Sequence, residues 1–304
     1  MNIIEVAPDL YLIPLDQKLP GFTSFISSWL YKGEKTFLVD VGPASTVPAL
    51  FEAMENLGVR SLDAILLTHI HIDHAGGVGD VVSLFSDAPV ICHSSAISHL
   101  EDPSRLWEGS LKTLGDVARA YGPIQPVPPN LIHHAVRPFK LSAEHEIVPF
   151  LTPGHAPHHV SYLFDKYLFA GEAGGVFKEL PDGNFYLRPA TPPRFFLEVT
   201  VHSINTLMKI PHDVLCYGHF GTTRRTPQML KTHKRQLIEW AEVIWGQMQF
   251  DEGPNLVAHC TELLLRKDPL LAGWRQMEPA VRERELNFIH NSIRGFIGYH
   301  KSVK

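Results

Sequence analysis

Thr68-His69-Ile70-His71-Ile72-Asp73-His74-Ala75-Gly76-Gly77 is the stretch of sequence that decides the fold. It places three imidazoles and one carboxylate within six residues, directly after the apolar run at residues 64–67. Such a run is typical of a strand buried on both faces, and ligand sites in α/β sheets lie beyond the carboxyl ends of strands. A turn after a strand can direct alternate side chains to one side. The first two histidines can therefore share one metal ion, and the adjacent Asp73 and His74 can reach a second.

Three further candidate ligands follow other strands that the sequence predicts. His155 comes after an expected strand at residues 146–152, Glu172 after one at 167–170, and His219 after one at 214–217. Each has a glycine directly before it, which lets the backbone bend tightly. The five histidines and two carboxylates together are sufficient for two cations with three terminal ligands each and one bridging carboxylate.

The quoted stretch resembles the signature motif of the metallo-β-lactamase superfamily, and the flanking elements follow in that family's order, beginning with Asp40 after an early strand. The resemblance covers about residues 1–222 and implies an α/β fold, a four-layer αββα sandwich with a dimetal site at one edge. It also implies the ligand sets: His69, His71 and His155 for the first metal ion, Asp73, His74 and His219 for the second, and Glu172 as the bridge.

Glu172 departs from the family pattern, because most of the family has aspartate there. Glutamate is one methylene longer, so the affinity and the identity of the second ion are open. Zinc is the expected ion for nitrogen and oxygen ligands, with iron and manganese as alternatives. The chain length and a helical C-terminal extension are similar to those of the quinolone-signal response thioesterase of bacteria, and that subgroup makes iron a serious alternative to zinc.

The rest of the sequence predicts alternating strands and helices, followed by a helical extension at residues 223–304 that acts as a lid or a dimer interface. Expected strands are at 10–13, 23–31, 36–40, 89–92, 131–136 and 159–164, and expected helices at 47–57, 77–85 and most of 96–121. Residues 176–200 are rich in proline and aromatic residues, so we expect a long loop that forms a pocket wall. Helical periodicity in the extension indicates three helices.

Composition limits the choice of partners. The formal charge is −5, so the chain has no basic surplus for binding nucleic acid. No run of 18 apolar residues predicts a membrane span, and no signal peptide is recognisable. Three scattered cysteines favour reduced thiols and a cytoplasmic location. A small-molecule substrate and a homodimer are the expected partners.

Two expectations concern residues around the candidate ligands. Asp40 is expected to order the histidine loop by hydrogen bonding, as carboxylates behind metal ligands do. The remaining histidines of interest are expected on the surface or in loops: His93, His99, His133, His134, His145, His158 and His159.

The favoured function is hydrolysis of an ester, thioester or lactone by a hydroxide that bridges the two metal ions. Asp73 is the candidate to orient this nucleophile and shuttle its proton. A phosphodiesterase would use the same metals, but the acidic net charge counts against it. A regulatory or ligand-binding protein that retains the fold is the alternative from a different class.

Overall fold

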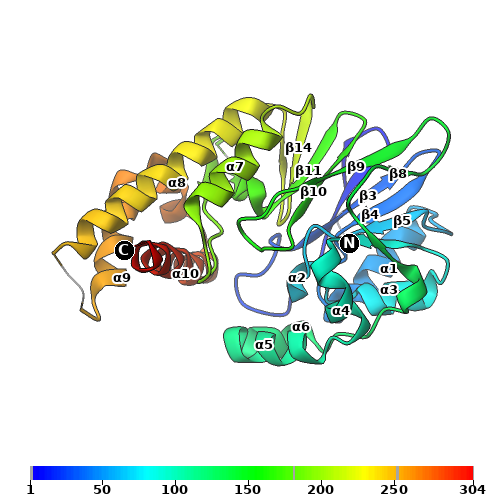
Figure 1. The fold of residues 1–304 in the computed structure, drawn as a ribbon, viewed down its shortest axis with the longest axis horizontal. Helices are drawn as coiled ribbons and strands as arrows, with labels where there is room; N and C mark the ends of the chain where they lie inside the picture. The colour runs from blue at the N-terminus through cyan, green and yellow to red at the C-terminus, as the bar shows by residue number, and fades with distance from the viewer. Residues whose placement is uncertain (1–2, 181, 251–252, 304) are drawn as a thin grey trace.

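Two β-sheets pack face to face, and helices cover both outer faces (Figure 1). The computed structural model describes residues 3–180, 182–250 and 253–303. The four-layer αββα arrangement confirms the predicted fold class. In the described part of the chain, no helix is both long and apolar enough to span a membrane.

The first sheet contains seven of the described strands, in the order β1 to β7. Neighbours from β1 to β4 are antiparallel, and those from β4 to β7 are parallel. The strands are β1 (Ile4–Ala7), β2 (Leu10–Pro14), β3 (Ser27–Lys32), β4 (Thr36–Val39), β5 (Ala64–Leu66), β6 (Val90–Cys92) and β7 (Ile132–His134). β5 is the buried strand predicted before the histidine motif, and all three of its residues are fully buried.

The second sheet contains six described strands, in the order β15-β14-β11-β10-β9-β8. Its strands are β8 (Phe139–Lys140), β9 (Glu146–Leu151), β10 (Val160–Phe164), β11 (Tyr167–Gly171), β14 (Val214–Tyr217) and β15 (Thr222–Thr223). β11 and β14 are parallel, which brings the chain ends of these two strands to the same edge. A separate hairpin consists of β12 (Val176–Glu179) and β13 (Phe185–Arg188).

The predicted helices are present, together with two that were not predicted, at Ile72–Ala75 and Leu197–Leu207. They are α1 (Val47–Asn56), α2 (Ile72–Ala75), α3 (Val78–Leu84), α4 (Ile97–Glu101), α5 (Ser104–Leu114), α6 (Asp116–Tyr121), α7 (Leu197–Leu207), α8 (Thr226–Met248), α9 (Leu256–Lys267) and α10 (Pro279–Ser302). Short 3-10 segments are η1 (Ala44–Thr46), η2 (Ser94–Ala96), η3 (Pro129–Leu131), η4 (Glu172–Gly174) and η5 (Pro269–Gln276). The three predicted helices of the C-terminal extension are confirmed as α8, α9 and α10.

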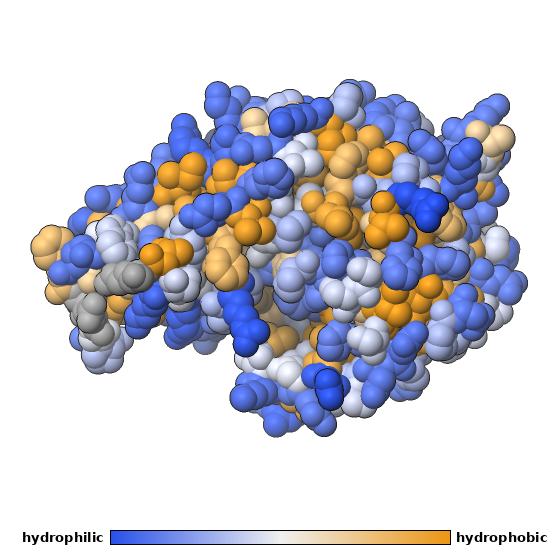
Figure 2. Space-filling model, in the orientation of Figure 1, coloured by the Kyte–Doolittle hydropathy of each residue, from blue (hydrophilic) through white to orange (hydrophobic). Residues whose placement is uncertain are grey.

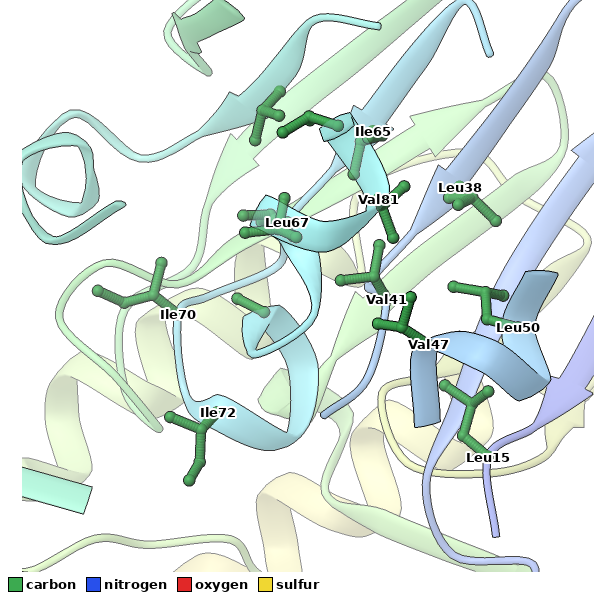
Figure 3. Packing of buried hydrophobic residues seen from close by; sticks show 14 of the residues in the cluster. Leu15, Leu38, Val41, Val47, Leu50, Ile65, Leu67, Ile70, Ile72 and Val81 are labelled. Atoms are coloured by element: carbon green, nitrogen blue, oxygen red, sulfur yellow. The ribbon is translucent and has the colours of Figure 1, made fainter. Parts of the chain in front are cut away.

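Apolar side chains fill the two layers that flank the first sheet. Figure 3 shows Leu38 of β4 and Ile65 of β5 in one packed layer with Leu50 of α1 and Val81 of α3. All four are fully buried, and each contributes about 1.5–3 kcal/mol relative to an exposed position. On the inner face, aromatic residues such as Phe169 join the two sheets. This packing fixes β5, and therefore fixes where the histidine motif begins.

The C-terminal helices share a hydrophobic cluster with the outer face of the second sheet. Leu168 of β11 and Leu215 of β14 belong to the same buried cluster as Leu237 and Trp240 of α8 and Phe296 of α10. α10 also reaches the first half of the chain, since the Arg284 guanidinium donates to the backbone oxygen of Gly21. The division at residue 222, and a lid or dimer role for the extension, stay predictions.

The prediction of a long loop over residues 176–200 is wrong. The segment contains the hairpin β12–β13 and the start of α7, and irregular backbone includes the part that carries the prolines at 189, 192 and 193. The hairpin forms because side chains of both strands, such as Phe177 and Tyr186, are buried, and this burial outweighs the sequence's loop-like composition. The strand predicted from residue 23 begins only at Ser27, because Ser24 has a positive φ of 48° that belongs to a turn.

Candidate metal centre

Strand ends place all seven predicted ligands at one edge of the sandwich. His69 and His71 lie in the turn after β5, and α2, which carries Asp73 and His74, follows immediately. His155 follows β9, Glu172 follows β11 and His219 follows β14, each within four residues of its strand. The structure thus brings together residues that follow strands of both sheets. They lie up to 150 positions apart in the sequence, from His69 to His219.

The first group consists of His69, His71, His155 and Glu172, whose candidate ligand atoms lie within 4.8 Å of one another. The Nδ1 atom of His71 is 3.1 Å from Nε2 of His69 and 2.9 Å from Nε2 of His155. Burial and the nearby His155 lower the pKa of His71 to about 3. His71 is therefore neutral near pH 7, with a lone pair for a cation.

The second group consists of Asp73, His74 and His219, again with ligand atoms within 4.8 Å of one another. The Oδ2 atom of Asp73 is 3.8 Å from Nε2 of His74 and 4.0 Å from Nε2 of His219. Burial opposes a charge on His74, but the carboxylates of Asp73 and Asp40 outweigh it and raise the pKa of His74 well above its usual value. This part of the site therefore favours positive charge.

Glu172 lies between the two groups and contacts both. Its Oε2 atom is 2.8 Å from Nε2 of His155 and 3.5 Å from Nε2 of His74, while its Oε1 atom is 3.1 Å from Nε2 of His219. Burial opposes ionisation of this carboxyl, but His155 and His219 outweigh it and hold the pKa of Glu172 well below its usual range. A charged carboxylate therefore occupies the place that a bridging ligand requires.

Asp40 holds the histidine loop, as the sequence predicts. Its Oδ1 atom accepts a hydrogen bond from the backbone N–H of Thr68 at 2.8 Å. Its Oδ2 atom accepts from the Thr68 hydroxyl at 2.7 Å and from Nδ1 of His74 at 2.8 Å. Asp40 itself has a positive φ of 55°, so these bonds maintain a backbone conformation that aspartate rarely adopts.

Hydrogen bonds at Nδ1 orient other imidazoles toward the shared centre. Nδ1 of His69 contacts the Thr68 hydroxyl at 3.0 Å, and since that hydroxyl donates to Asp40, the histidine is the donor. Nδ1 of His155 donates to the backbone oxygen of Ala190 at 2.9 Å. Both histidines therefore present Nε2 as a lone-pair donor, which is how hydrogen bonds behind a metal site select the ligating atom.

His159 was expected on the surface or in a loop, and it lies in the loop before β10 but not on the surface. The side chain is fully buried, and its Nε2 atom accepts a hydrogen bond from the backbone N–H of Glu172 at 3.1 Å. The Thr152 hydroxyl contacts Nδ1 of the same ring at 2.9 Å. Gly171 permits this approach, because a β-carbon at that position would collide with the imidazole. The signal was the place of His159 next to the buried strand at 160–164. The predicted exposure of His133 and His134 is confirmed.

An aromatic wall beside the second group was also missed. The ring of Phe25 stacks on the imidazole of His219, and the Arg284 guanidinium lies 3.8 Å from the centre of the Phe25 ring. The hydroxyl of Ser27 donates to the backbone oxygen of His219. These contacts join residues about 190 to 260 positions apart in the sequence, and no local pattern reports them.

The donor set fits two divalent cations. Nε2 of His74 is buried and makes no hydrogen bond to any residue in the described part of the chain, although two carboxylate oxygens lie within 3.8 Å. Imidazole nitrogens and carboxylate oxygens that face one another around an otherwise unpartnered nitrogen are arranged as ligands of a common ion. The surface is hollowed between the C-terminal helices and helices α5 and α6, beside α2 (Figures 1 and 2). Asp73 retains 19% of its side-chain exposure, so solvent reaches the site.

Comparisons with known proteins agree with this geometry. The sequence pattern of the Metallo-beta-lactamase superfamily matches residues 21–219, which include all seven candidate ligands. The chain belongs to the metallo-β-lactamase superfamily, and its histidine-rich site is of the metallo-hydrolase type.

Several relatives carry names that describe the same class. A metallo-β-lactamase fold-containing protein of Sulfurisphaera tokodaii is 27% identical over 73% of this chain and 82% of its own length. A probable metallo-hydrolase of Methanocaldococcus jannaschii is 29% identical over 55% of this chain and 78% of its own. A hydroxyacylglutathione hydrolase of Yersinia enterocolitica is 27% identical over 79% of this chain and 84% of its own. A crystal structure of a metallo-β-lactamase family protein from Thermus thermophilus shares the fold with a TM-score of 0.68, at 22% identity, over 98% of this chain and 95% of that one.

Proposed function

We propose that this chain is a dinuclear metal-dependent hydrolase of an ester, thioester or lactone. The observation that carries the proposal is the position of Glu172, whose two oxygens contact histidines of both ligand groups. A carboxylate in that position can hold two cations near each other, as in hydrolases with two-metal sites. Zinc is the ion we propose, with iron and manganese as alternatives.

The candidate ligands would bind the two metal ions in two sets. His69, His71 and His155 would hold one ion, and Asp73, His74 and His219 the other, with Glu172 between them. When both ions are bound, they would lower the pKa of a water and polarise the carbonyl oxygen of the substrate.

Asp73 is the proposed catalytic carboxylate. It is the only one of the two ligand carboxylates with substantial exposure, 19% against 5% for Glu172. It can orient the attacking water by accepting its hydrogen bond, and it can take the proton and return it to the leaving group.

Ester or thioester chemistry is favoured over phosphodiester chemistry. The formal charge of −5 leaves no overall basic surplus for a polyanionic substrate. Relatives named hydroxyacylglutathione hydrolase support the proposal of a hydrolysed acyl bond. The helical C-terminal extension supports the narrower proposal that this chain is similar to the quinolone-signal response thioesterase of bacteria.

The test combines metal content with hydrolysis. We expect the wild-type protein, purified without added metal or chelator, to contain close to two equivalents of metal by elemental mass spectrometry and to hydrolyse an S-aryl thioester. His69→Ala should lose both properties. The exposed His133→Ala is the matched control and should keep both. Thioester hydrolysis by His69→Ala with no bound metal would refute the mechanism. Rapid cleavage of bis(nitrophenyl) phosphate without thioester cleavage would favour the phosphodiesterase, and a metal-containing protein inert to both would favour the ligand-binding protein.

A further inference from the structure

The outward face of helix α8 carries a continuous stripe of exposed side chains. Its members are Lys231, Arg235, Ile238, Glu242 and Trp245, which follow one another at alternating intervals of four and three residues. This spacing places the five side chains in one row along the helix, as in the seam of a coiled coil. The opposite face of α8 is buried in the cluster that it shares with the second sheet and α10.

Two members of the stripe are large hydrophobic residues. Ile238 is 38% exposed in the middle of the stripe, and Trp245 is 37% exposed although its ring also contacts that of His300. Helix α7 packs beside α8, and exposed Phe196 and Val199 lie at its start. Figure 2 shows hydrophobic side chains between hydrophilic ones on the surface over these two helices. Hydrophobic residues gathered on one exposed face are typical of an interface with another protein.

The charged residues of α8 are separated by sign. The N-terminal half of the stripe is basic, with Lys231 and Arg235, and the C-terminal half is acidic, with Glu242. Lys234 and Glu239, beside the stripe, follow the same division. The pair that Arg235 and Glu239 form within the helix is 3.4 Å long and more than half exposed, so it contributes little. A helix divided in this way repels a parallel copy of itself and attracts an antiparallel one.

Ile238 is the centre of this pattern. Lys231 lies seven residues before it and Trp245 seven residues after it. If two copies of α8 cross antiparallel at Ile238, this residue meets its own counterpart, and Lys231 of each copy faces Trp245 of the other. An ammonium group beside an indole ring is a favourable cation–π pair. Arg235, three residues before the centre, and Glu242, four residues after it, also come face to face.

We propose that two copies of this chain form a twofold-symmetric dimer through this stripe, with their α8 helices antiparallel and crossing at Ile238. A second copy fits better than an unrelated protein, because one row of side chains supplies both the basic and the acidic half of a complementary surface. The dimer does not depend on the proposed hydrolase function, since none of the seven candidate ligands belongs to α8.

Sedimentation equilibrium of the full-length protein tests the proposal. At micromolar concentrations we expect the wild type to have twice the 34.1 kDa mass of one chain. Ile238→Asp places two carboxylates against each other at the centre of the interface, and it should raise the dissociation constant about 100-fold or more. Equal dissociation constants in the wild type and Ile238→Asp, or a monomeric wild type, would overturn the proposal.

Leu84→Asp is the matched control. Leu84 is 66% exposed at the end of α3, so this variant also replaces an exposed aliphatic side chain by a carboxylate, but outside the stripe. It should have the dissociation constant of the wild type. A dimer that Leu84→Asp weakens as strongly as Ile238→Asp would contradict the proposed interface.

Exchange of charges tests the antiparallel arrangement. Arg235→Glu faces Glu242 of the second copy, and Glu242→Arg faces Arg235, so each single variant should weaken the dimer about tenfold or more. The double variant Arg235→Glu/Glu242→Arg should associate like the wild type, because opposite charges face each other again. An equal mixture of the two single variants should also associate, as heterodimers. Both side chains are exposed, so these variants should fold. A double variant as weak as the single variants would refute the antiparallel pairing and therefore the proposal.

Discussion

The ring of Phe25 lies stacked on the imidazole of His219, with ring centroids 4.3 Å apart and an interplanar angle of 21°. The guanidinium of Arg284 covers the Phe25 ring at 3.8 Å from its centre. Through this stack, a helix at the end of the chain restricts the rotation of a ligand of the second group. The geometry of the candidate metal centre therefore depends on α10, although α10 supplies no ligand.

Phe25→Ala should weaken the second metal position. Without the stacked ring, His219 gains rotational freedom, and holding its Nε2 atom in a ligating position costs more conformational entropy. We expect metal content to fall from about two equivalents toward one, measured by elemental mass spectrometry. Phe85→Ala, in the α3 region and remote from the ligands, is the control and should keep both equivalents. Full metal content in Phe25→Ala would show that the stack has no such role.

Asp40→Asn should reduce metal affinity while the protein stays folded. The amide keeps the size of the side chain but removes the charge that holds Nδ1 of His74, and one of its two heteroatoms can no longer accept. Loss of such an outer hydrogen bond lowers metal affinity by about 10–100-fold. Competition with a chromogenic chelator measures the change. Asp63→Asn removes a partly buried carboxylate far from the ligands and should leave the affinity as it is. An unaltered affinity in Asp40→Asn would contradict the prediction.

Glu172→Asp tests whether the longer side chain is needed here. Glu172 contacts His155 at 2.8 Å and His219 at 3.1 Å, and a side chain shorter by one methylene cannot keep both contacts on this backbone. We therefore expect one equivalent of metal in Glu172→Asp and impaired hydrolysis. Glu172→Gln retains the length but not the charge, and separates the two effects. Two tightly bound equivalents in Glu172→Asp would mean that the backbone after β11 moves to suit aspartate.

Glu285→Gln should destabilise the protein in a pH-dependent way. Burial alone would raise the pKa of Glu285, but Arg188 and Arg284 outweigh it and lower this pKa from 4.5 to about 2. Because the pKa is lower in the folded state, the carboxylate stabilises the fold above about pH 4.5, and this contribution is lost as the pH falls toward about 2. Removing one partner of a buried ion pair costs about 3–5 kcal/mol.

Urea unfolding at pH 7 and at pH 3 measures this effect. The free energy of unfolding of Glu285→Gln should lie well below that of the wild type at pH 7, and the gap should narrow at pH 3. A gap of equal size at both pH values would show that the charge of Glu285 contributes nothing.

The sequence predicts that the candidate ligands lie together, and the reason is local. His155, Glu172 and His219 each stand at a glycine-containing strand end, and strand ends of one sandwich meet at one edge. The hydrophobic run before His69 likewise predicts its strand, because burial on both faces leaves a local signature.

What the sequence does not predict depends on contacts between distant segments. His159 behind Glu172, and Phe25 beside His219, become recognisable only when separate strands and loops are brought together. The β12–β13 hairpin was missed because its proline- and aromatic-rich composition is typical of a loop. Tertiary packing of Phe177 against Tyr217, with ring centroids 4.7 Å apart, decides its structure instead.

The hydrophobic cluster that joins the second sheet to the C-terminal helices has a consequence for biosynthesis. Leu168 and Leu215 belong to this cluster, but Phe296, which packs in it, is synthesised about 80 residues after Leu215. While the chain is still being translated, the outer face of the second sheet stays uncovered and exposes apolar side chains to association with other nascent chains. The outer face of the second sheet should therefore be covered only after α10 has left the ribosome, and premature termination within α10 should harm folding more than changes in most surface loops.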